Sequence, residues 1–332
     1  MKKLVVFVLL LTVISPMLLS FKDGVTLRRG DDKDGAFTFL IAGFDDAAEN
    51  TDALLLLSYS PKNNAVSFLQ IPRDTYYHSG TGTNRINSVY SSLIAKGEDR
   101  NDAMSALCSA VSGALGVKIN GFAGYDKVAF KRIMKAIGDI EIYLPKDLTY
   151  DRNDGERVTL YKAGSQVFTS EEVLNFVRFR EGYLMGDLGR VDAQKLFFGA
   201  LAKKLRNDFG VKMVFKLLSV GSEGIVSDIS PREMAALAIK NRGKIMDAKV
   251  YFATLPGTST EEGSLGWYYA VNREASIKVI EALDLTKYRE FDIEGRFLKS
   301  DSENFRAIYN KTGHSYRIYD ENTLTEMDIK VG

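Results

Sequence analysis

The chain has 332 residues, of which 45% are hydrophobic and 26% charged, with 44 Lys and Arg against 43 Asp and Glu. These proportions suit a globular protein and exclude a disordered chain, a collagen-like repeat or a coiled coil. The net charge of +1 argues against a protein that binds nucleic acid, because neutralising phosphates takes a basic excess. The single cysteine, Cys108, can form neither an internal disulfide nor a cysteine zinc site, so chemistry here would rest on Asp, Glu and Arg.

The amino-terminal segment predicts the compartment. Lys2 and Lys3 precede residues 4–21, an uncharged and mostly apolar run close to the ~20 residues that cross a bilayer as a helix. The positive flank places residues 1–3 in the cytoplasm and the body outside it. A cleavable signal peptide is the alternative, but no clear small-x-small cleavage site follows. We expect a signal anchor over 4–21, a polar linker over 22–35, and a single-pass protein of the cell membrane with an extracytoplasmic body.

The next region alternates strand and helix patterns. Apolar runs predict strands at residues 36–43, 53–60, 65–71, 140–144 and 249–255. Helical patterns cover residues 87–96, 102–115, 125–137, 170–176, 190–209, 211–220, 231–241 and 272–282. Continuous apolar strands are covered on both faces. We therefore predict an α/β (α+β) fold, with a central mixed β-sheet flanked by helices over residues 36–283 and a C-terminal extension over 284–332.

Two acidic residues bracket the loop between the first two predicted strands. Asp45 follows one strand and Asp52 precedes the next, so a short loop brings both carboxylates to one edge of the sheet. Hard oxygen ligands completed by water and a substrate phosphate suit Mg²⁺ or Mn²⁺. The alternative is an ordinary solvated acidic loop.

Arginines follow several of the predicted elements. Arg73 and Asp74 end the third strand, where α/β sheets gather ligand groups, and Arg85 precedes a helix. A guanidinium can hold phosphate bidentately, which lysine cannot reproduce. The alternative is a set of surface ion pairs.

A second group of arginines lies near residues 178–194. Arg178 and Arg180 would share one face of an extended segment, without a carboxylate partner, and repel each other unless a polyanion lies between them. Arg190 and Gln194, four residues apart, share one side of a helix. Together with Arg85, these arginines predict a local positive pocket, or else surface salt bridges.

Other residues invite a functional interpretation that we do not favour. Trp267, in the segment Trp-Tyr-Tyr, is predicted to belong to an aromatic core or edge element rather than to a carbohydrate platform. Cys108 lies on an apolar helical face and is predicted to be core.

The ordered motifs resemble the LytR-CpsA-Psr family of bacterial cell-envelope proteins. The resemblance spans roughly residues 36–283 and rests on the anchor, the Thr51-Asp52 element, SFLQIPRDTYY (67–77), RINSVY (85–90), ALGVKIN (114–120), GDIEIYLPKDLTY (138–150), FVRFREG (176–182) and GDLGRVDAQK (186–195). The sequence departs from the family pattern in a short loop between the two acids, in Ala53 for a usual threonine, and in Arg85 where lysine is common.

The resemblance implies an enzyme, an extracytoplasmic phosphotransferase that moves an anionic glycopolymer (teichoic acid or capsule) from an undecaprenyl-pyrophosphate carrier to peptidoglycan. It implies metal ligands at Asp45 and Asp52. It implies phosphate-holding groups at Arg73, Arg85, Arg178, Arg180, Arg190 and Gln194. The polyprenyl chain would occupy an apolar tunnel between sheet and helices. Asp74 is the first candidate base and Asp187 the second. A polyprenyl-pyrophosphate phosphatase, or a non-catalytic protein that binds the lipid carrier or regulates, remains the alternative.

Overall fold

The body of the protein is described by a computed structural model. It covers residues 36–78, 84–208, 213, 216–217, 219–229, 247–261, 266–287, 290–291, 295–298 and 302–331. The predicted anchor, the linker and the predicted helix over 231–241 lie outside these residues. Within them, no helix has the length and apolar character needed to cross a membrane.

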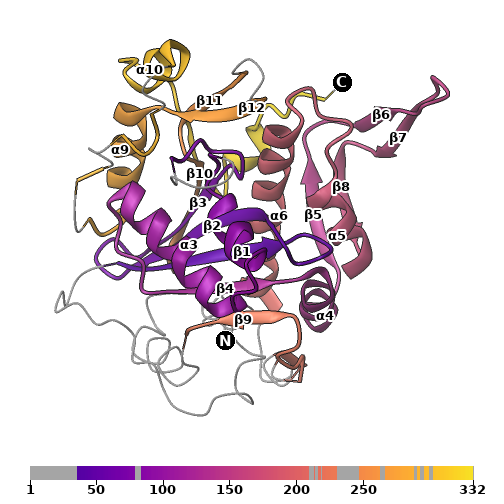
Figure 1. Cartoon of the computed structure of the whole chain (residues 1–332). Coiled ribbons are helices and arrows are strands. Elements are labelled where there is room, and N and C mark those ends of the chain that lie inside the picture. The colour runs from indigo at the N-terminus through magenta and orange to yellow at the C-terminus, as the bar shows by residue number, and fades with distance from the viewer. Residues whose placement is uncertain are drawn as a thin grey trace.

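A seven-stranded mixed sheet forms the centre of the fold, as predicted (Figure 1). Its strand order is β13 (Ile318–Asp320), β10 (Lys249–Thr254), β3 (Ala65–Ile71), β2 (Thr51–Ser60), β1 (Phe37–Phe44), β4 (Gly121–Tyr125) and β9 (Ile225–Ser227). The pairs β1–β4 and β3–β10 are parallel, and the other neighbours are antiparallel.

Helices cover both faces of this sheet, which explains why its central strands are apolar without alternation. Phe39 and Ile41 of β1 belong to the core under α4 (Lys127–Ile137), α5 (Ser170–Arg178) and α6 (Asp187–Asp208). Leu40 and Ala42 point to the opposite core, under α2 (Ser88–Ile94), α3 (Arg100–Leu115) and α9 (Arg273–Ala282). The molecule is therefore a three-layer sandwich with two cores.

Short strand pairs are attached to the sandwich. They are β5 (Ile140–Leu144) with β8 (Gly164–Phe168), β6 (Leu148–Asp151) with β7 (Arg157–Tyr161), and β11 (Gly257–Glu261) with β12 (Trp267–Val271). In Figure 1 the β6–β7 pair projects from one side of the top of the molecule, and β11–β12 lies with α10 (Glu303–Tyr309) on the other.

Residues late in the chain pack onto the sandwich rather than away from it. The strand β13 adds an edge to the central sheet, and the short helix η3 (Leu324–Glu326) follows it. Leu324 is buried against α6 at Gly199, and any side chain at position 199 would collide with it. Further on, the backbone of Val331 pairs with Tyr183, and the Leu184 N–H donates to the Lys330 carbonyl at 3.0 Å. These residues hold the loop between α5 and α6.

Candidate active site

Arg73 links three parts of the chain at one end of the sheet. It stands two residues after β3, and its guanidinium forms an ion pair with Asp52 of β2. Asp187, the first residue of α6, lies 3.7 Å from its Nη2, and Asp74 lies 3.8 Å from its Nε. The structure thus brings Asp52 and Asp187, distant in the sequence, to the adjacent pair Arg73 and Asp74, so that three carboxylates surround one cation.

Arg190 lies beside this group, on the first turns of α6. Its side chain is 5% exposed; one Nη lies 2.7 Å from the Asp187 carboxylate and donates to the Asp52 carbonyl at 3.0 Å. The glycines around it explain its position: Gly186 has a φ of +51°, which begins the turn into the helix, and Gly189 lets the Tyr183 ring pack directly against the helix backbone.

Half-buried Arg73 and buried Arg190 differ in their electrostatic surroundings. Burial by itself lowers the pKa of Arg73, but Asp187, Asp74 and Asp52 together raise it above its ordinary value. Burial lowers the pKa of Arg190, and Asp187 and Asp52 only partly offset this effect because Arg73 and Arg180 are also near. The Nε atoms of both arginines are buried and have no hydrogen-bond partner among the described residues. Buried donors without partners mark a place where an anion can bind.

Asp74 and Arg85 form the outer side of the same cluster. Arg85 Nε lies 3.3 Å from the Asp74 carboxylate, and its Nη2 donates to the Trp267 carbonyl at 3.0 Å. Burial raises the pKa of Asp74 by more than Arg73 and Arg85 lower it. A carboxylate that is harder to ionise than usual is a better proton acceptor once it is ionised, which suits a general base.

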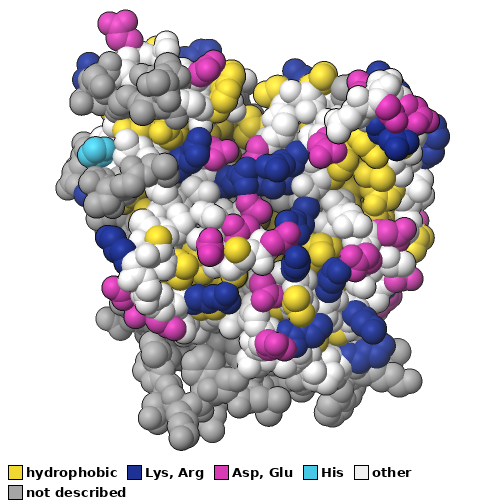
Figure 2. All heavy atoms as spheres, turned by 45° about the vertical axis from the view of Figure 1, so that its right-hand side comes forward, with side chains coloured by type: hydrophobic (Ala, Val, Ile, Leu, Met, Phe, Trp, Pro, Cys, Tyr) yellow, Lys and Arg dark blue, Asp and Glu magenta, His cyan; other side chains and the backbone are white. Residues whose placement is uncertain are grey.

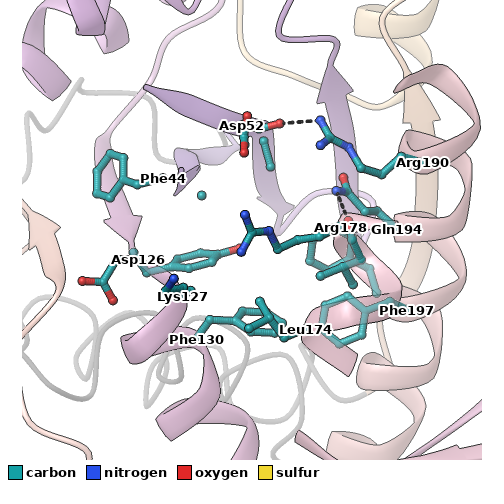
Figure 3. Close-up of a pocket in the computed structure, with 15 residues that line it drawn as sticks. Phe44, Asp52, Asp126, Lys127, Phe130, Leu174, Arg178, Arg190, Gln194 and Phe197 are labelled. Atoms are coloured by element: carbon teal, nitrogen blue, oxygen red, sulfur yellow. Dashed lines mark hydrogen bonds between the residues drawn. The ribbon is translucent and has the colours of Figure 1, made fainter. Parts of the chain in front are cut away.

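A cavity opens beside the cluster, between the sheet and α4, α5 and α6 (Figure 3). Its volume is about 590 Å³, measured out to its open mouth. Asp52 and Arg190 lie on one side, Phe130, Leu174 and Phe197 lie on the opposite side, and Arg178 extends between the two sides.

The apolar side of this cavity continues more deeply under the sheet. A second cavity of about 470 Å³ shares four aromatic residues with the first, namely Tyr125, Phe130, Phe197 and Phe198. Its other lining side chains are also apolar, among them Ile41 and Leu201. Burial raises the pKa of Tyr125 to about 12, so its phenol is neutral. An uncharged aromatic passage therefore leads from the charged cluster into the core.

Arg178 differs from its prediction in two ways. It is the last residue of α5 instead of part of an extended segment, so it does not alternate with Arg180 on a strand. It also has a carboxylate partner, Asp46, at 2.8 Å, and Lys127 lies 3.2 Å from the same carboxylate. The capping box at Thr169 and Glu172 starts α5 as predicted, and its helical hydrogen bonding runs on to Arg178 because no residue before it breaks the helix.

Arg180 and Gln194 complete the set of predicted phosphate-holding residues. Arg180 is exposed and near enough to Arg190 to affect its pKa. Gln194 lines the cavity one turn after Arg190, on the same side of α6, as predicted. Its amide donates to the Val177 carbonyl at 2.9 Å and accepts from Gln70 at 3.1 Å, so it fastens the end of α5 to the sheet. Figure 2 shows Lys, Arg, Asp and Glu side chains gathered in the middle of this face of the molecule.

The predicted metal ligands lie at the same end of the β1–β2 hairpin, with different contacts. The Asp45 carboxylate accepts from Glu49 N and Asn50 Nδ2, both at 2.9 Å, whereas Asp52 lines the cavity and pairs with Arg73. Among the described residues, no group of three or more His, Cys, Asp or Glu side chains could hold a metal. The pair fits a magnesium ion only if phosphate and water supply the remaining ligands, and both carboxylates retain acceptor positions for this.

Several residues near the site were not predicted. Asp46, Lys127 and the aromatic lining of the cavity come from the β1–β2 loop, α4 and α6. Asp46 is adjacent to the predicted ligand Asp45, and Lys127 lies in the predicted helix over 125–137. Nothing in either local pattern pointed to the cavity. Trp267, expected in a core or edge element, does begin an edge strand, but its side chain is 61% exposed.

Known proteins resemble this chain in sequence and in fold. The model of the LytR_cpsA_psr family matches residues 19–284. The polyisoprenyl-teichoic acid–peptidoglycan teichoic acid transferase TagV of Bacillus subtilis is 27% identical over 271 residues, which cover 77% of this chain and 67% of TagV. The transferase TagU of Bacillus mycoides is 25% identical over 280 residues, which cover 79% of this chain and 86% of TagU. The crystal structure of B. subtilis TagV superimposes with a TM-score of 0.59 at 24% identity, over 76% of this chain and 99% of that one.

Proposed function

The chain belongs to the LytR_cpsA_psr family, and we propose that it is an extracytoplasmic phosphotransferase that moves an anionic glycopolymer from an undecaprenyl-pyrophosphate carrier to peptidoglycan. TagV and TagU are named for the transfer of teichoic acid to peptidoglycan. The observation that carries the proposal is the junction of an aromatic passage with a buried arginine cluster. A lipid pyrophosphate has the same two halves, an apolar chain and a compact anion.

The proposed donor would span this junction. Its polyprenyl chain would lie among Phe130, Phe197 and Phe198, where burying apolar surface contributes about 25 cal/mol per Å². Its pyrophosphate would then meet Arg190, with Arg178 at the mouth. The free Nε donors of Arg73 and Arg190 and the N-terminal end of α6 all favour negative charge there.

The transfer itself needs positioning and charge neutralisation more than covalent help from the protein. A hydroxyl oxygen of the muramic acid attacks the phosphorus attached to the glycopolymer, and the bond from that phosphorus to the bridging oxygen breaks. Polyprenyl phosphate leaves with the bond electrons, and the hydroxyl proton passes to a base. Asp74 suits this role better than Asp187, which lies between Arg73 and Arg190 and forms an ion pair with each. The arginines stabilise the charge on the leaving phosphate.

Magnesium would be held by Asp52 and Asp45, with phosphate oxygens completing its shell. When bound, it would neutralise charge that develops on the phosphates. For Asp45, this requires its side chain to turn from the loop bonds with Glu49 and Asn50.

The proposed location follows from the N-terminal sequence. Residues 1–3 would be cytoplasmic, residues 4–21 would anchor the protein, and the body would face the cell wall. This arrangement places the mouth of the cavity on the side of the membrane where peptidoglycan lies. A reporter fused after Asp31 should be active outside the cytoplasm.

The test uses the full chain in detergent with a polyprenyl-pyrophosphate-linked glycopolymer labelled in the sugar, with and without peptidoglycan, and with and without Mg²⁺. We expect label to appear in peptidoglycan and polyprenyl phosphate to be released, only when both are present. Release of phosphate at the same rate without peptidoglycan would identify a phosphatase. Donor that binds but never turns over would identify a carrier or regulatory protein. Asp52→Ala should raise the Mg²⁺ concentration for half-maximal rate by at least about tenfold.

A further inference from the structure

Trp267 is the only tryptophan of the chain, and it is exposed beside the charged cluster. It is the first residue of β12, and its side chain is 61% exposed, whereas the next four residues of the strand are buried. A large aromatic side chain open to solvent next to a site is unusual enough to need an explanation, because burying it would stabilise the fold.

The backbone of Trp267 is fixed relative to the candidate base. Its carbonyl accepts from Arg85 Nη2 at 3.0 Å, and Arg85 Nε lies 3.3 Å from the Asp74 carboxylate. Two residues on, the Tyr269 N–H donates to the main-chain carbonyl of Asp74 at 2.9 Å, and its carbonyl accepts from Tyr76 N at 2.9 Å. The strand is thus bonded to the same segment that carries the base.

The underside of β12 is packed, so its position does not depend on Trp267. Tyr268 contacts Tyr76 and Phe305 edge-on, at centroid separations of 5.4 and 5.8 Å, and Arg85 lies over the Tyr268 ring at 5.2 Å. The aromatic cluster holds the strand, and the exposed Trp267 adds nothing to it. Its exposed indole ring is therefore available to a ligand.

We propose that Trp267 is the stacking platform of a sugar subsite, which holds an N-acetylhexosamine ring of the acceptor glycan next to Asp74. The C–H groups on one face of a pyranose carry partial positive charge and pack on the negative face of an indole ring. The acceptor must bring a hydroxyl to the base, and the backbone of Trp267 is bonded to Arg85, the partner of Asp74, whereas Trp267 is not among the residues that line the lipid cavity. This inference rests on the proposed function, and it names the residue that recognises the acceptor.

A sugar ring fits these surroundings better than a second apolar segment or an anion. Arg85, which bonds the Trp267 carbonyl, is already paired with Asp74, and an uncharged sugar suits a charge that has its partner. Other exposed apolar side chains belong to other elements, such as Tyr143 at 47% on β5, Val167 at 67% on β8 and Leu184 at 69% in the loop before α6. Trp267 is the one exposed residue of β12, and a single exposed ring is a small platform that suits a single flat ligand.

The single tryptophan makes a direct measurement possible, since all of the indole fluorescence comes from Trp267. The full chain in detergent is titrated with soluble glycan fragments of alternating N-acetylglucosamine and N-acetylmuramic acid, and separately with the stem peptide alone. We expect a saturable shift of emission to shorter wavelength with the glycan and none with the peptide. An equal shift with the peptide, or no shift with the glycan, would overturn the sugar subsite.

Kinetics give the second measurement. Trp267→Ala should raise the KM for the glycan acceptor by about tenfold more than the KM for the lipid donor. Trp267→Phe, which keeps a ring, should recover most of the loss, and Tyr143→Ala, an exposed aromatic on β5, should behave as the unchanged protein. An unaltered acceptor KM in Trp267→Ala would contradict the proposal while leaving the transferase function intact. If the unchanged protein transfers nothing, the proposed function fails, and the fluorescence titration alone decides the subsite.

Discussion

The strand side and the helix side of the site each carry one arginine, and the protein treats their charges differently. Arg73, beside β3, has three carboxylates within ion-pair distance, and these raise its pKa despite burial. Arg190, on α6, shares one of those carboxylates, but burial lowers its pKa, and the nearby Arg73 and Arg180 lower it further. The N-terminal end of α6 adds further positive potential around Arg190.

This difference separates two roles that a list of arginines would merge. The charge of Arg73 is balanced by the protein and joins β2, β3 and α6. The charge of Arg190 is undercompensated by the protein, so an incoming phosphate would gain the most from it. Preorganised charge of this kind stabilises a transition state because the protein has already borne the free energy of assembling it.

Substitution of Arg73 should have the largest effect, because Arg73 joins β2, β3 and α6 and its Nε also offers a donor to the phosphate. Arg73→Met leaves Asp52, Asp74 and Asp187 without their shared cation. We expect the free energy of unfolding to fall by about 3 kcal/mol and the transfer rate by about 1,000-fold, measured by denaturant unfolding and by labelled transfer. Arg73→Lys should recover stability better than rate, since an ammonium cannot span the same ligands. Unchanged unfolding in Arg73→Met would contradict a structural role.

Substitution of Arg190 should divide activity from stability. Because burial lowers the pKa of Arg190, its charge is a burden on the folded state, and a methionine of similar length removes that burden. Arg190→Met should therefore melt at or above the temperature of the unchanged protein while its rate falls by about 100-fold or more. Calorimetry with the same transfer assay checks both. A large fall in melting temperature would mean that both buried arginines serve the fold.

The candidate base gives a pH test of the strand side. Burial raises the pKa of Asp74 above its ordinary value of 3.8, so ionising it favours the unfolded chain. The stability it contributes is present below that ordinary value and is lost as the pH rises through the raised pKa. Asp74→Asn should accordingly be more stable at neutral pH and equally stable in acid, while the rate falls by about 100-fold and the acid limb of its pH profile disappears. An acid limb that persists in Asp74→Asn would transfer the role to Asp187.

Substitution of the exposed arginines Arg178 and Arg180 should cause the smallest loss of transfer rate. Arg178→Ala and Arg180→Ala should each lower the rate by roughly 30-fold with a nearly unchanged melting temperature. The sequence predicts no partner for Arg178, whereas the structure pairs it with Asp46. The melting temperature should still stay nearly unchanged, because this ion pair is solvent-exposed and exposed pairs contribute little to stability. Asp46→Ala is the matched control, and it should retain most of the rate. Equal losses of rate in Arg178→Ala and Asp46→Ala would mean that Arg178 contributes to the reaction only through its ion pair with Asp46.

The parts of the fold that the sequence predicted were those determined by local pattern. The strands β1, β2 and β3 and the helices α3, α4 and α9 lie within two residues of their predicted ranges, because continuous apolar runs and capping residues define them. The strands β4, β9 and β13 were missed. They are short, and each exists only because a distant partner pairs with it.

The site divides in the same way. Residues at strand ends, such as Arg73 after β3 and Asp52 at the start of β2, were predicted because the ends of sheet strands collect functional groups. The partner of Arg178 was not, since the distance from Asp46 to Arg178 depends on how α5 packs against the β1–β2 loop. The exposure of Trp267 was also missed, because an aromatic segment looks the same in sequence whether its first ring faces the core or solvent.

The contact between Tyr183 and Val331 has a consequence for the order in which the protein is built. The loop before α6 carries Arg180 and leads into Asp187 and Arg190, but it is held by backbone bonds to residues at the far end of the described chain. A chain made from its amino terminus can form β1 to β3 early, since their contacts are local. The loop that leads into Asp187 and Arg190 gains its backbone bonds to Lys330 and Val331 only after synthesis has passed these residues, so this part of the site is completed late.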